Sequence, residues 1–328
     1  MTLTYTNPVW PRSFADPFVL RWQGEYYAYG TGPALPDTQT GESRVFPLLR
    51  SRDLVHWEEC SGTLLPLTET EKRHYWAPEV VESEGRFYLY YSASDGSSDE
   101  TQCLRVAVAD HPLGPFVDSG TLLLPDEGFS IDAHPFRDPA DGRWYLFFAK
   151  DYFDARVGTA LAVVPLAADM VSVSGPVQNA VRPVGDWQIY ERNRMLYNQT
   201  WEAWHTVEGP FVLFDKGRYY CLYSGGNWQG AEYGVGYAVA DQVLGPYQDS
   251  GLGPAVLKGV SGIVLGPGHN SVVLGPDNKT CFIVYHAWDA AKTARRLCID
   301  PLVWTETGPH AAGPTYTPQT ISLPDLKK

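Results

Sequence analysis

One alternation of polar and apolar residues occurs five times along the chain. Each copy begins with an ionisable residue, continues as a short apolar strand and a turn, and ends in a second strand rich in aromatic residues. Short apolar runs on either side of a tight turn are typical of β-hairpins. The pattern therefore predicts five hairpins, over residues 16–30, 79–92, 132–149, 208–224 and 269–286.

The spacing of the hairpins predicts how they are arranged. They recur at intervals of roughly 60 residues, more than the ~40–50 residues of common propeller blades, which leaves room for outer strands. Two such outer strands, Cys103–Asp110 and Tyr233–Asp241, resemble one another, and each precedes a Gly-Pro turn. The sequence thus predicts an all-β fold, a five-bladed β-propeller that occupies residues 1–328 as a single domain.

Two segments depart from the repeat. Residues 181–207 form a long insertion rich in aromatic residues, immediately before Glu208, and a connection of this length predicts a lid or a rim around a site. The tail, 301–328, is rich in Pro, Gly and Thr and is expected to return and close the ring.

The residues that open the five copies are candidates for a common site. If each opens the innermost strand of a blade, radial symmetry brings Asp16, Glu79, Asp132, Glu208 and His269 to one mouth of the central channel. For a single copy, an opening such as Asp-Pro is more often a turn residue than a functional one. Five copies in the same position favour a site, because repeated charge on a channel does not stabilise a fold.

The amino-acid composition agrees with an all-β fold, and the net charge argues against two classes of binding partner. The 328 residues are 44% hydrophobic and include eleven Trp and twenty Tyr, residues enriched in strands. The net charge of −13 argues against nucleic acid and anionic membranes as partners, because both require basic surfaces.

The expected location is the cytoplasm. The first residues contain neither a basic region nor an apolar run typical of a secretory signal, and no stretch approaches the ~18 apolar residues of a membrane-spanning helix. The five cysteines are an odd number without CxxC spacing, which is typical of a reducing compartment.

Four of the five opening residues carry a carboxyl group, and three of these, Asp16, Asp132 and Glu208, suggest acid–base chemistry. Glycoside hydrolysis needs an acid that protonates the leaving oxygen and a base that activates water, about 6.5–9.5 Å apart in inverting enzymes. Neighbouring carboxylates also raise one another's proton affinity, which keeps an acid protonated near neutral pH. Asp16, Asp132 and Glu208 around a sugar-sized funnel therefore suit a glycosidase.

Several short motifs, in this order and spacing, resemble glycoside hydrolase family 43. They are Asn7-Pro8 with Phe14-Ala-Asp-Pro17, Tyr75-Trp-Ala-Pro-Glu79, Ser130-Ile-Asp132, Val207-Glu-Gly-Pro210 and Gly268-His-Asn-Ser271. The resemblance implies a five-bladed propeller and inverting hydrolysis of α-L-arabinofuranosides, β-D-xylosides or related glycans.

The resemblance also implies a role for each carboxylate. Asp16 matches the general base, Glu208 the general acid, and Asp132 the carboxylate that tunes and orients the acid. The third copy reads Ile-Asp-Ala-His where the family more often has Ile-Asp-Pro.

Four further residues are expected around the sugar. His269 matches an axial histidine that faces water or a calcium ion in many members of the family. The chemistry requires no cofactor, and a calcium ion in the channel near His269 is the metal that the resemblance allows. Arg295 matches an arginine that approaches the sugar, and Trp76 and Trp204 are candidates to stack on it, although Trp in a propeller mostly packs between blades.

Other functions stay open on the sequence. A carbohydrate-binding propeller without catalysis would keep the aromatic rim but would not need three carboxylates. A fructan-cleaving propeller hydrolase would carry an Asn-Asp-Pro-Asn motif, which is absent. Many β-xylosidases of family 43 carry an additional C-terminal β-sandwich, whereas this sequence ends soon after the last repeat. We therefore expect an exo-acting α-L-arabinofuranosidase that acts on oligosaccharides, with a β-D-xylosidase or another arabinan- or galactan-acting hydrolase as the alternative.

Overall fold

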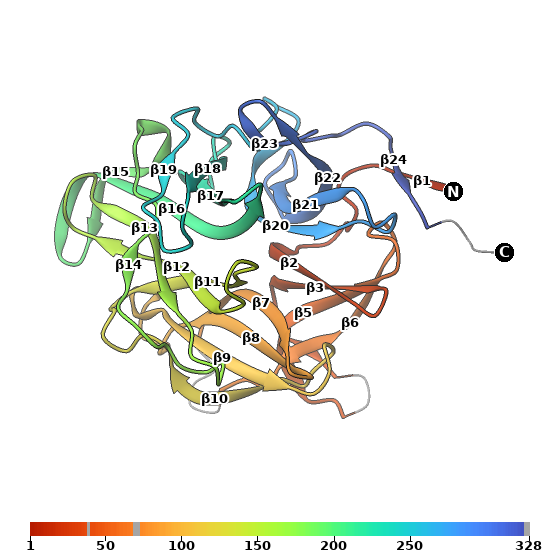
Figure 1. The fold of residues 1–328 in the computed structure, drawn as a ribbon, viewed down its shortest axis with the longest axis horizontal. Helices are drawn as coiled ribbons and strands as arrows, with labels where there is room; N and C mark the ends of the chain where they lie inside the picture. The colour runs from red at the N-terminus through yellow and green to blue at the C-terminus, as the bar shows by residue number, and fades with distance from the viewer. Residues whose placement is uncertain (38–39, 68–72, 325–328) are drawn as a thin grey trace.

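Five twisted blades of antiparallel strands surround a central axis (Figure 1), and a short parallel pairing of residues 158–159 with residues 205–206 joins the third and fourth blades into one sheet. This arrangement is found in a computed structural model, which describes residues 1–37, 40–67 and 73–324. Each blade begins with one of the predicted hairpins, whose first strand lies nearest the axis. The predicted five-bladed propeller is thus confirmed.

The blades follow one another along the chain. Blade 1 contains β2 (Ala15–Trp22), β3 (Glu25–Thr31), β5 (Ser43–Ser51) and β6 (Trp57–Leu64), with β4 (Leu35–Pro36) beside β5. Blade 2 contains β7 (Tyr75–Ser83), β8 (Arg86–Ala93), β9 (Cys103–Ala109) and β10 (Val117–Leu122). Blade 3 contains β11 (Ser130–Arg137), β12 (Trp144–Tyr152), β13 (Gly158–Pro165) and β14 (Gln178–Asn179).

The last two blades complete the ring. Blade 4 contains β16 (Gln199–Asp215), β17 (Arg218–Gly225), β18 (Gly234–Ala240) and β19 (Gln248–Asp249). Blade 5 contains β20 (Leu265–Leu274), β21 (Cys281–Trp288), β22 (Arg295–Thr305) and β23 (Gly308–Ala311). The chain ends lie together, because β1 (Thr2–Tyr5) pairs with β24 (Gln319–Ser322). The tail therefore does return to the start of the chain, although its last four residues lie outside the described part.

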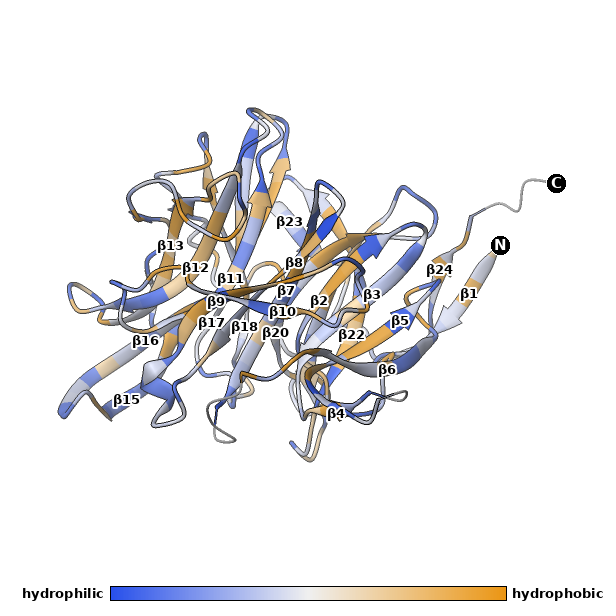
Figure 2. Ribbon diagram, turned by 90° about the horizontal axis from the view of Figure 1, so that it is seen from below, coloured by the Kyte–Doolittle hydropathy of each residue, from blue (hydrophilic) through white to orange (hydrophobic). Residues whose placement is uncertain are grey.

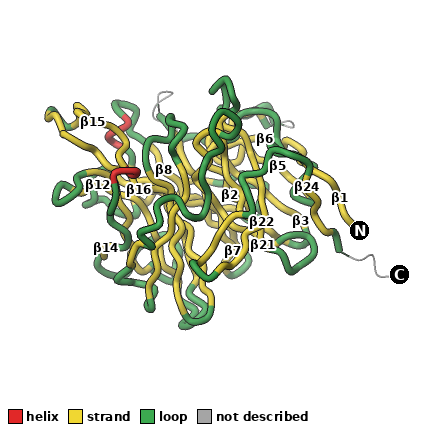
Figure 3. Tube along the Cα trace, turned by 90° about the horizontal axis from the view of Figure 1, so that it is seen from above, coloured by secondary structure: helices red, strands yellow, loops and turns green. Residues whose placement is uncertain are grey.

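The aromatic insertion before Glu208 is a projecting hairpin. After the short 3-10 helix η2 (Asp186–Gln188), β15 (Ile189–Leu196) pairs with the first half of β16, and the second half of β16 is the inner strand of blade 4. Figures 2 and 3 show β15 extending beyond the ring, with a hydrophilic tip in Figure 2. The other 3-10 helix, η1 (Asp99–Thr101), lies between β8 and β9. No helix in the described residues is both long and apolar enough to cross a membrane.

The core lies between neighbouring blades. Tyr29, Tyr91 and Tyr285, from the second strands of three blades, are completely buried there. The hydroxyl of Tyr29 donates to the Pro112 carbonyl (2.7 Å). Those of Tyr91 and Tyr285 donate to the carboxylates of Asp118 (2.5 Å) and Asp300 (2.7 Å). Because each buried phenol has a hydrogen-bond partner, these rings fill the spaces between blades without leaving a polar group unsatisfied.

Candidate active site

Every blade carries the same irregularity at the mouth of the channel. In each inner strand, two residues lie opposite a single residue of the second strand, which defines a β-bulge. The first bulge residue has a φ between 47° and 59° in all five blades. A bulge with left-handed backbone changes the direction in which its side chain points. The five first bulge residues are Asp16, Ala77, Asp132, Gly209 and His269.

This register corrects the expectation that the five ionisable residues occupy equivalent positions. Asp16, Asp132 and His269 do so. In blade 4 the first bulge residue is Gly209, so Glu208 precedes the bulge. In blade 2 it is Ala77, so Glu79 follows the bulge, deeper in the channel.

The second strands of four blades share a hydrogen bond near the bulges. In each of them, the residue that pairs with the last residue before the bulge accepts a hydrogen bond from the backbone N–H of the first bulge residue in the next blade. The acceptors are Thr31 (2.8 Å), Ser92 (3.1 Å), Ser224 (2.7 Å) and His286 (3.1 Å). The equivalent residue of blade 3 is Ala149, whose side chain contains no hydrogen-bond acceptor. The Gly209 N–H instead donates to the Asp132 carboxylate (3.0 Å).

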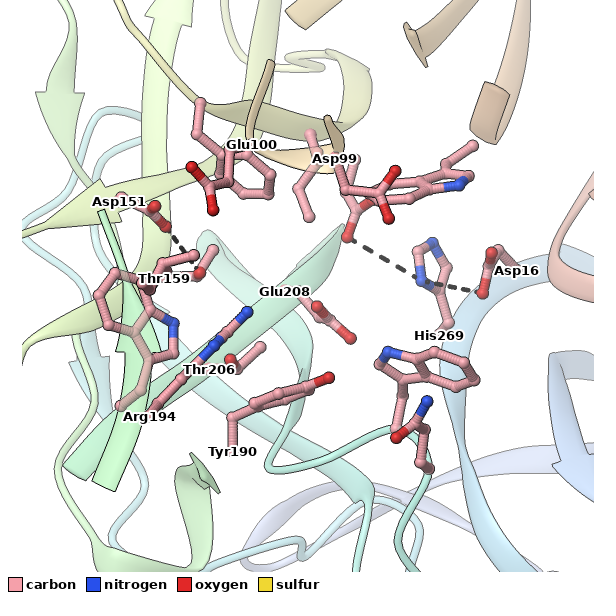
Figure 4. Close-up of a pocket in the computed structure, with 18 of the residues that line it drawn as sticks. Asp16, Asp99, Glu100, Asp151, Thr159, Tyr190, Arg194, Thr206, Glu208 and His269 are labelled. Carbon is pink, nitrogen blue, oxygen red and sulfur yellow. Dashed lines mark hydrogen bonds and ion pairs between the residues drawn. The ribbon is translucent and has the colours of Figure 1, made fainter. Parts of the chain in front are cut away.

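The predicted catalytic carboxylates share one cavity. Its volume is about 430 Å³, and Asp16, Asp132 and Glu208 all line it. Figure 4 shows Asp16 and Glu208 pointing into the cavity, with His269 beside Asp16. Asp16 belongs to blade 1 and Glu208 to blade 4, so blade 5 separates them on one side of the ring.

Asp16 is held as an anion. Burial would raise its pKa, but the opposing effect of the Arg295 guanidinium (3.0 Å) and of His269 and His286 prevails, so the pKa lies well below the ordinary range. Burial lowers the pKa values of both histidines, which leaves Arg295 as the permanent positive charge beside Asp16. Arg295 is therefore the charge that stabilises the Asp16 anion.

Glu208 is shifted in the opposite direction. Burial, together with the negative charge of Asp16, raises its pKa to about 7, although Tyr233 lowers it by donating a hydrogen bond (2.6 Å). Burial and the nearby Glu208 likewise raise the pKa of Asp132 well above its ordinary value. One buried cavity therefore holds an ionised carboxylate, Asp16, and two carboxyl groups with raised pKa values, Glu208 and Asp132.

His269 lies between the two aspartates, without a cluster of metal ligands around it. Its Nδ1 is 3.5 Å from Asp16 and 4.0 Å from Asp132. Ca²⁺ takes six to eight oxygen ligands, whereas the described residues contain no group of three or more His, Cys, Asp or Glu placed to hold a metal. The side chains here do not fit a protein-ligated calcium ion.

Comparison with known proteins identifies the family. The model of the glycosyl hydrolases family 43 matches residues 5–309. The chain belongs to this family. Its members are inverting glycosidases that act on O-glycosyl bonds, and this chain is accordingly a glycoside hydrolase.

Individual relatives within family 43 differ in substrate. The chain is 31% identical over 324 residues to the beta-D-galactofuranosidase xynD of Aspergillus niger, covering 92% of this chain and 83% of that protein. It is 27% identical over 295 residues to an extracellular exo-alpha-(1->5)-L-arabinofuranosidase of Streptomyces chartreusis, covering 86% and 82%. A thermostable family-43 glycoside hydrolase of known structure superposes with a TM-score of 0.82 at 32% identity, covering 96% and 98%.

The remaining predicted sugar contacts of this family 43 chain lie at the cavity. Arg295 lines it and lies over the Trp228 ring (4.4 Å), whereas the adjacent Arg296 pairs with Asp289, as strand alternation predicts. Trp76 and Trp204 line it as well. Only 1% of Trp204 is exposed, so its ring has almost no free surface on which a sugar could stack.

Glu79 lies outside this cavity and joins blades. Its carboxylate accepts from His134 Nδ1 (2.7 Å), and His134 Nε2 accepts from the Val212 N–H (3.0 Å). Glu79 belongs to blade 2, His134 to blade 3 and Val212 to blade 4, so this buried pair connects three inner strands. The contacts are those of a structural residue.

Several cavity residues were not anticipated from the sequence. Tyr190 and Arg194 come from the projecting β15, and Trp228 from the loop between β17 and β18. Tyr233 was assigned only to an outer strand, yet its hydroxyl contacts Glu208. The aromatic insertion indicated a rim but not which of its side chains face the cavity.

Proposed function

We propose that this enzyme removes terminal α-L-arabinofuranosyl units from oligosaccharides. The observation that carries the acid–base assignment is the pair of opposite pKa shifts at Asp16 and Glu208 within one cavity. An ionised base and a protonated acid at neutral pH are the two states that inverting hydrolysis requires.

The reaction then proceeds in one displacement. Asp16 accepts a proton from a water molecule as the water oxygen forms a bond to the anomeric carbon. The glycosidic C–O bond breaks, and its electron pair takes the proton of Glu208. Asp132 accepts a hydrogen bond from the Gly209 N–H and lies beside the acid, and its raised pKa means that Asp132 and Glu208 do not ionise together. The acid and base come from the chain itself, so the proposed mechanism needs no cofactor.

The substrate assignment rests on the relatives. α-L-Arabinofuranose and β-D-galactofuranose share the configuration of the furanose ring and differ in the length of the exocyclic chain. The exo-arabinofuranosidase of Streptomyces chartreusis supports the first sugar, and the galactofuranosidase of Aspergillus niger supports the second. β-D-Galactofuranoside hydrolysis is therefore the second candidate activity.

A second cavity supports an oligosaccharide substrate. It has a volume of about 510 Å³, and the two cavities share four lining residues, Glu100, Phe129, Asp151 and Tyr197. In Figure 4, Asp151 and Glu100 lie on the far side of Glu208 from Asp16. In an in-line displacement the leaving group departs on the side opposite to the attacking water, so the second cavity is where the rest of the glycan would lie.

A cytoplasmic location stays a prediction. All five cysteines are unpaired, which supports a reducing compartment.

A panel of aryl glycosides tests the activity. We expect 4-nitrophenyl α-L-arabinofuranoside to be hydrolysed with the highest kcat/KM, the β-D-galactofuranoside to be second, and the β-D-xylopyranoside to be poor. A highest kcat/KM on the xyloside would overturn the furanoside proposal. Absence of hydrolysis of every aryl glycoside and of arabino-oligosaccharides would favour a binding protein.

A further inference from the structure

Glu208 is in contact with a buried tyrosine that the reaction scheme above does not use. The Tyr233 hydroxyl lies 2.6 Å from Glu208 Oε1, and only 1% of the Tyr233 side chain is exposed. Burial, followed by the charge of Glu208, raises the pKa of this phenol well above its ordinary value. The phenol therefore keeps its proton and acts as the donor in this contact.

The ring of Tyr233 has little freedom to move. It lies nearly parallel to the His286 ring, with centroids 6.1 Å apart and an angle of 7° between the planes. On another side it approaches Gly268 so closely that a Cβ at that position would lie 2.3 Å from the ring. The glycine leaves the space that the tyrosine occupies. The hydroxyl is thus fixed relative to β16 and β20.

The hydrogen bonds that lead to Tyr233 have a defined direction. The His269 backbone N–H can only donate, and it donates to Ser224 Oγ (2.7 Å). The Ser224 side chain also interacts with the Tyr233 hydroxyl. Because the one hydrogen of the phenol goes to Glu208, Ser224 can act in this contact only as the donor. Tyr233 then donates to Glu208. This series of hydrogen bonds begins at a backbone N–H, which can act only as a donor.

We propose that Tyr233 is a positioning residue for the general acid. By donating to Oε1, it restricts the catalytic proton to Oε2 of Glu208 and holds that oxygen toward the cavity. A protonated carboxyl group has one acidic hydrogen, so a fixed donor on one oxygen decides which oxygen delivers the proton. The inference rests on the proposed role of Glu208 as the acid.

Other charged groups also act on Glu208 and must be kept in place during a test. Asp16 raises its pKa, Arg295 and Arg194 lower it, and Asp132 is the adjacent carboxylate. None of these four is altered by removing the Tyr233 hydroxyl. A change in the pH dependence of a Tyr233 variant therefore reports on the hydrogen bond itself.

The decisive variant is Tyr233→Phe. On an oligosaccharide, whose leaving group needs protonation, we expect kcat to fall by roughly tenfold or more, as for loss of one hydrogen bond to an ionisable group. On an activated aryl glycoside the loss should be much smaller. The basic limb of the kcat/KM profile should move to higher pH, because a donor that favours the ionised carboxylate has been removed.

The matched control is Tyr223→Phe. Tyr223 is equally buried in the same blade, but its hydroxyl contacts Asp249 and Gln188. This control should keep the wild-type profile. A Tyr233→Phe enzyme with wild-type kcat on the oligosaccharide and an unmoved basic limb would overturn the proposal, as would an equal shift in Tyr223→Phe.

A second variant covers the case in which Tyr233→Phe does not fold. Ser224→Ala removes the group that orients the phenol, and we expect a smaller shift of the basic limb in the same direction. An unmoved limb in Ser224→Ala would then overturn the proposal. Failure of the arabinofuranosidase assignment is a separate result, because these comparisons can use whichever glycoside the wild-type enzyme hydrolyses.

Discussion

Replacing Glu208, the proposed proton donor, should change both the rate of hydrolysis and its dependence on pH. The environment of Glu208 raises its pKa from 4.5 to about 7. At pH 7, roughly half of the enzyme then carries a protonated acid, compared with about 0.3% for an ordinary glutamic acid. Burial and neighbouring charge thus increase the competent fraction about 150-fold.

The sign of the pH effect follows from these two carboxyl groups. Activity requires Glu208 protonated, so kcat/KM should fall about tenfold per pH unit above about 7. Activity also requires Asp16 ionised, and its pKa is lowered, so activity should persist below the ordinary aspartate pKa of ~3.9 as long as the protein stays folded.

The assay compares Glu208→Gln with wild type on two substrates. On an arabino-oligosaccharide, Gln cannot supply the proton, and we expect a loss of at least ~10²-fold with no basic limb near pH 7. On an aryl arabinofuranoside with a good leaving group, activity should be partly restored. Asp16→Asn is the matched control, because loss of the base should reduce hydrolysis of both substrates alike.

Two results would refute this reasoning. A basic limb near pH 7 that persists in Glu208→Gln belongs to another group. Equal losses on both substrates would mean that Glu208 does not protonate the leaving oxygen. Circular dichroism of each variant must first show that the fold is retained.

Three further predictions concern the stereochemistry of hydrolysis, the stability contributed by Glu79 and the hydrogen bond between Gly209 and Asp132. Because Asp16 and Glu208 come from non-adjacent blades, proton NMR of the first-formed sugar should show inverted configuration; retention would mean direct attack by a carboxylate. Glu79→Leu should lower the free energy of unfolding by about 1–3 kcal/mol, because the buried His134 Nδ1–H loses its acceptor, with kcat unchanged; a reduced kcat would show a role in the reaction. Ala149→Ser would offer the Gly209 N–H a second acceptor and should lower kcat by releasing Asp132, whereas unchanged kinetics would show that this bond is dispensable.

Much of the fold could be predicted because its signals are local. Alternation, turn residues and aromatic second strands define the hairpins, and their regular recurrence defines the ring. The approximate level of the site followed from the same repeat. Aspartates at 16 and 132 and the histidine at 269 occupy equivalent positions because the bulge begins at each of them.

Other features could not be predicted because they depend on register and on distant partners. The polar residue at the start of a strand does not reveal whether a bulge begins before or after it. For this reason the sequence does not predict that Glu79 follows the bulge of its strand and lies deeper in the channel than Asp16. The donor to Glu208 is 25 residues away, in a segment whose pattern indicated only an outer strand. Burial of Trp204 depends on Arg194 and Trp201, which pack against it from the projecting hairpin.

The alanine at 149 shows how a symmetric scaffold acquires a unique function. Five similar blades would, if identical, satisfy every bulge N–H with the same kind of side chain and leave no donor available. One substitution in one copy leaves a single N–H for the Asp132 carboxylate. In a protein built by repetition, chemistry therefore arises where one copy lacks what the others share. Aligning the copies of a propeller against one another, and looking for the missing side chain, is accordingly a way to find its site.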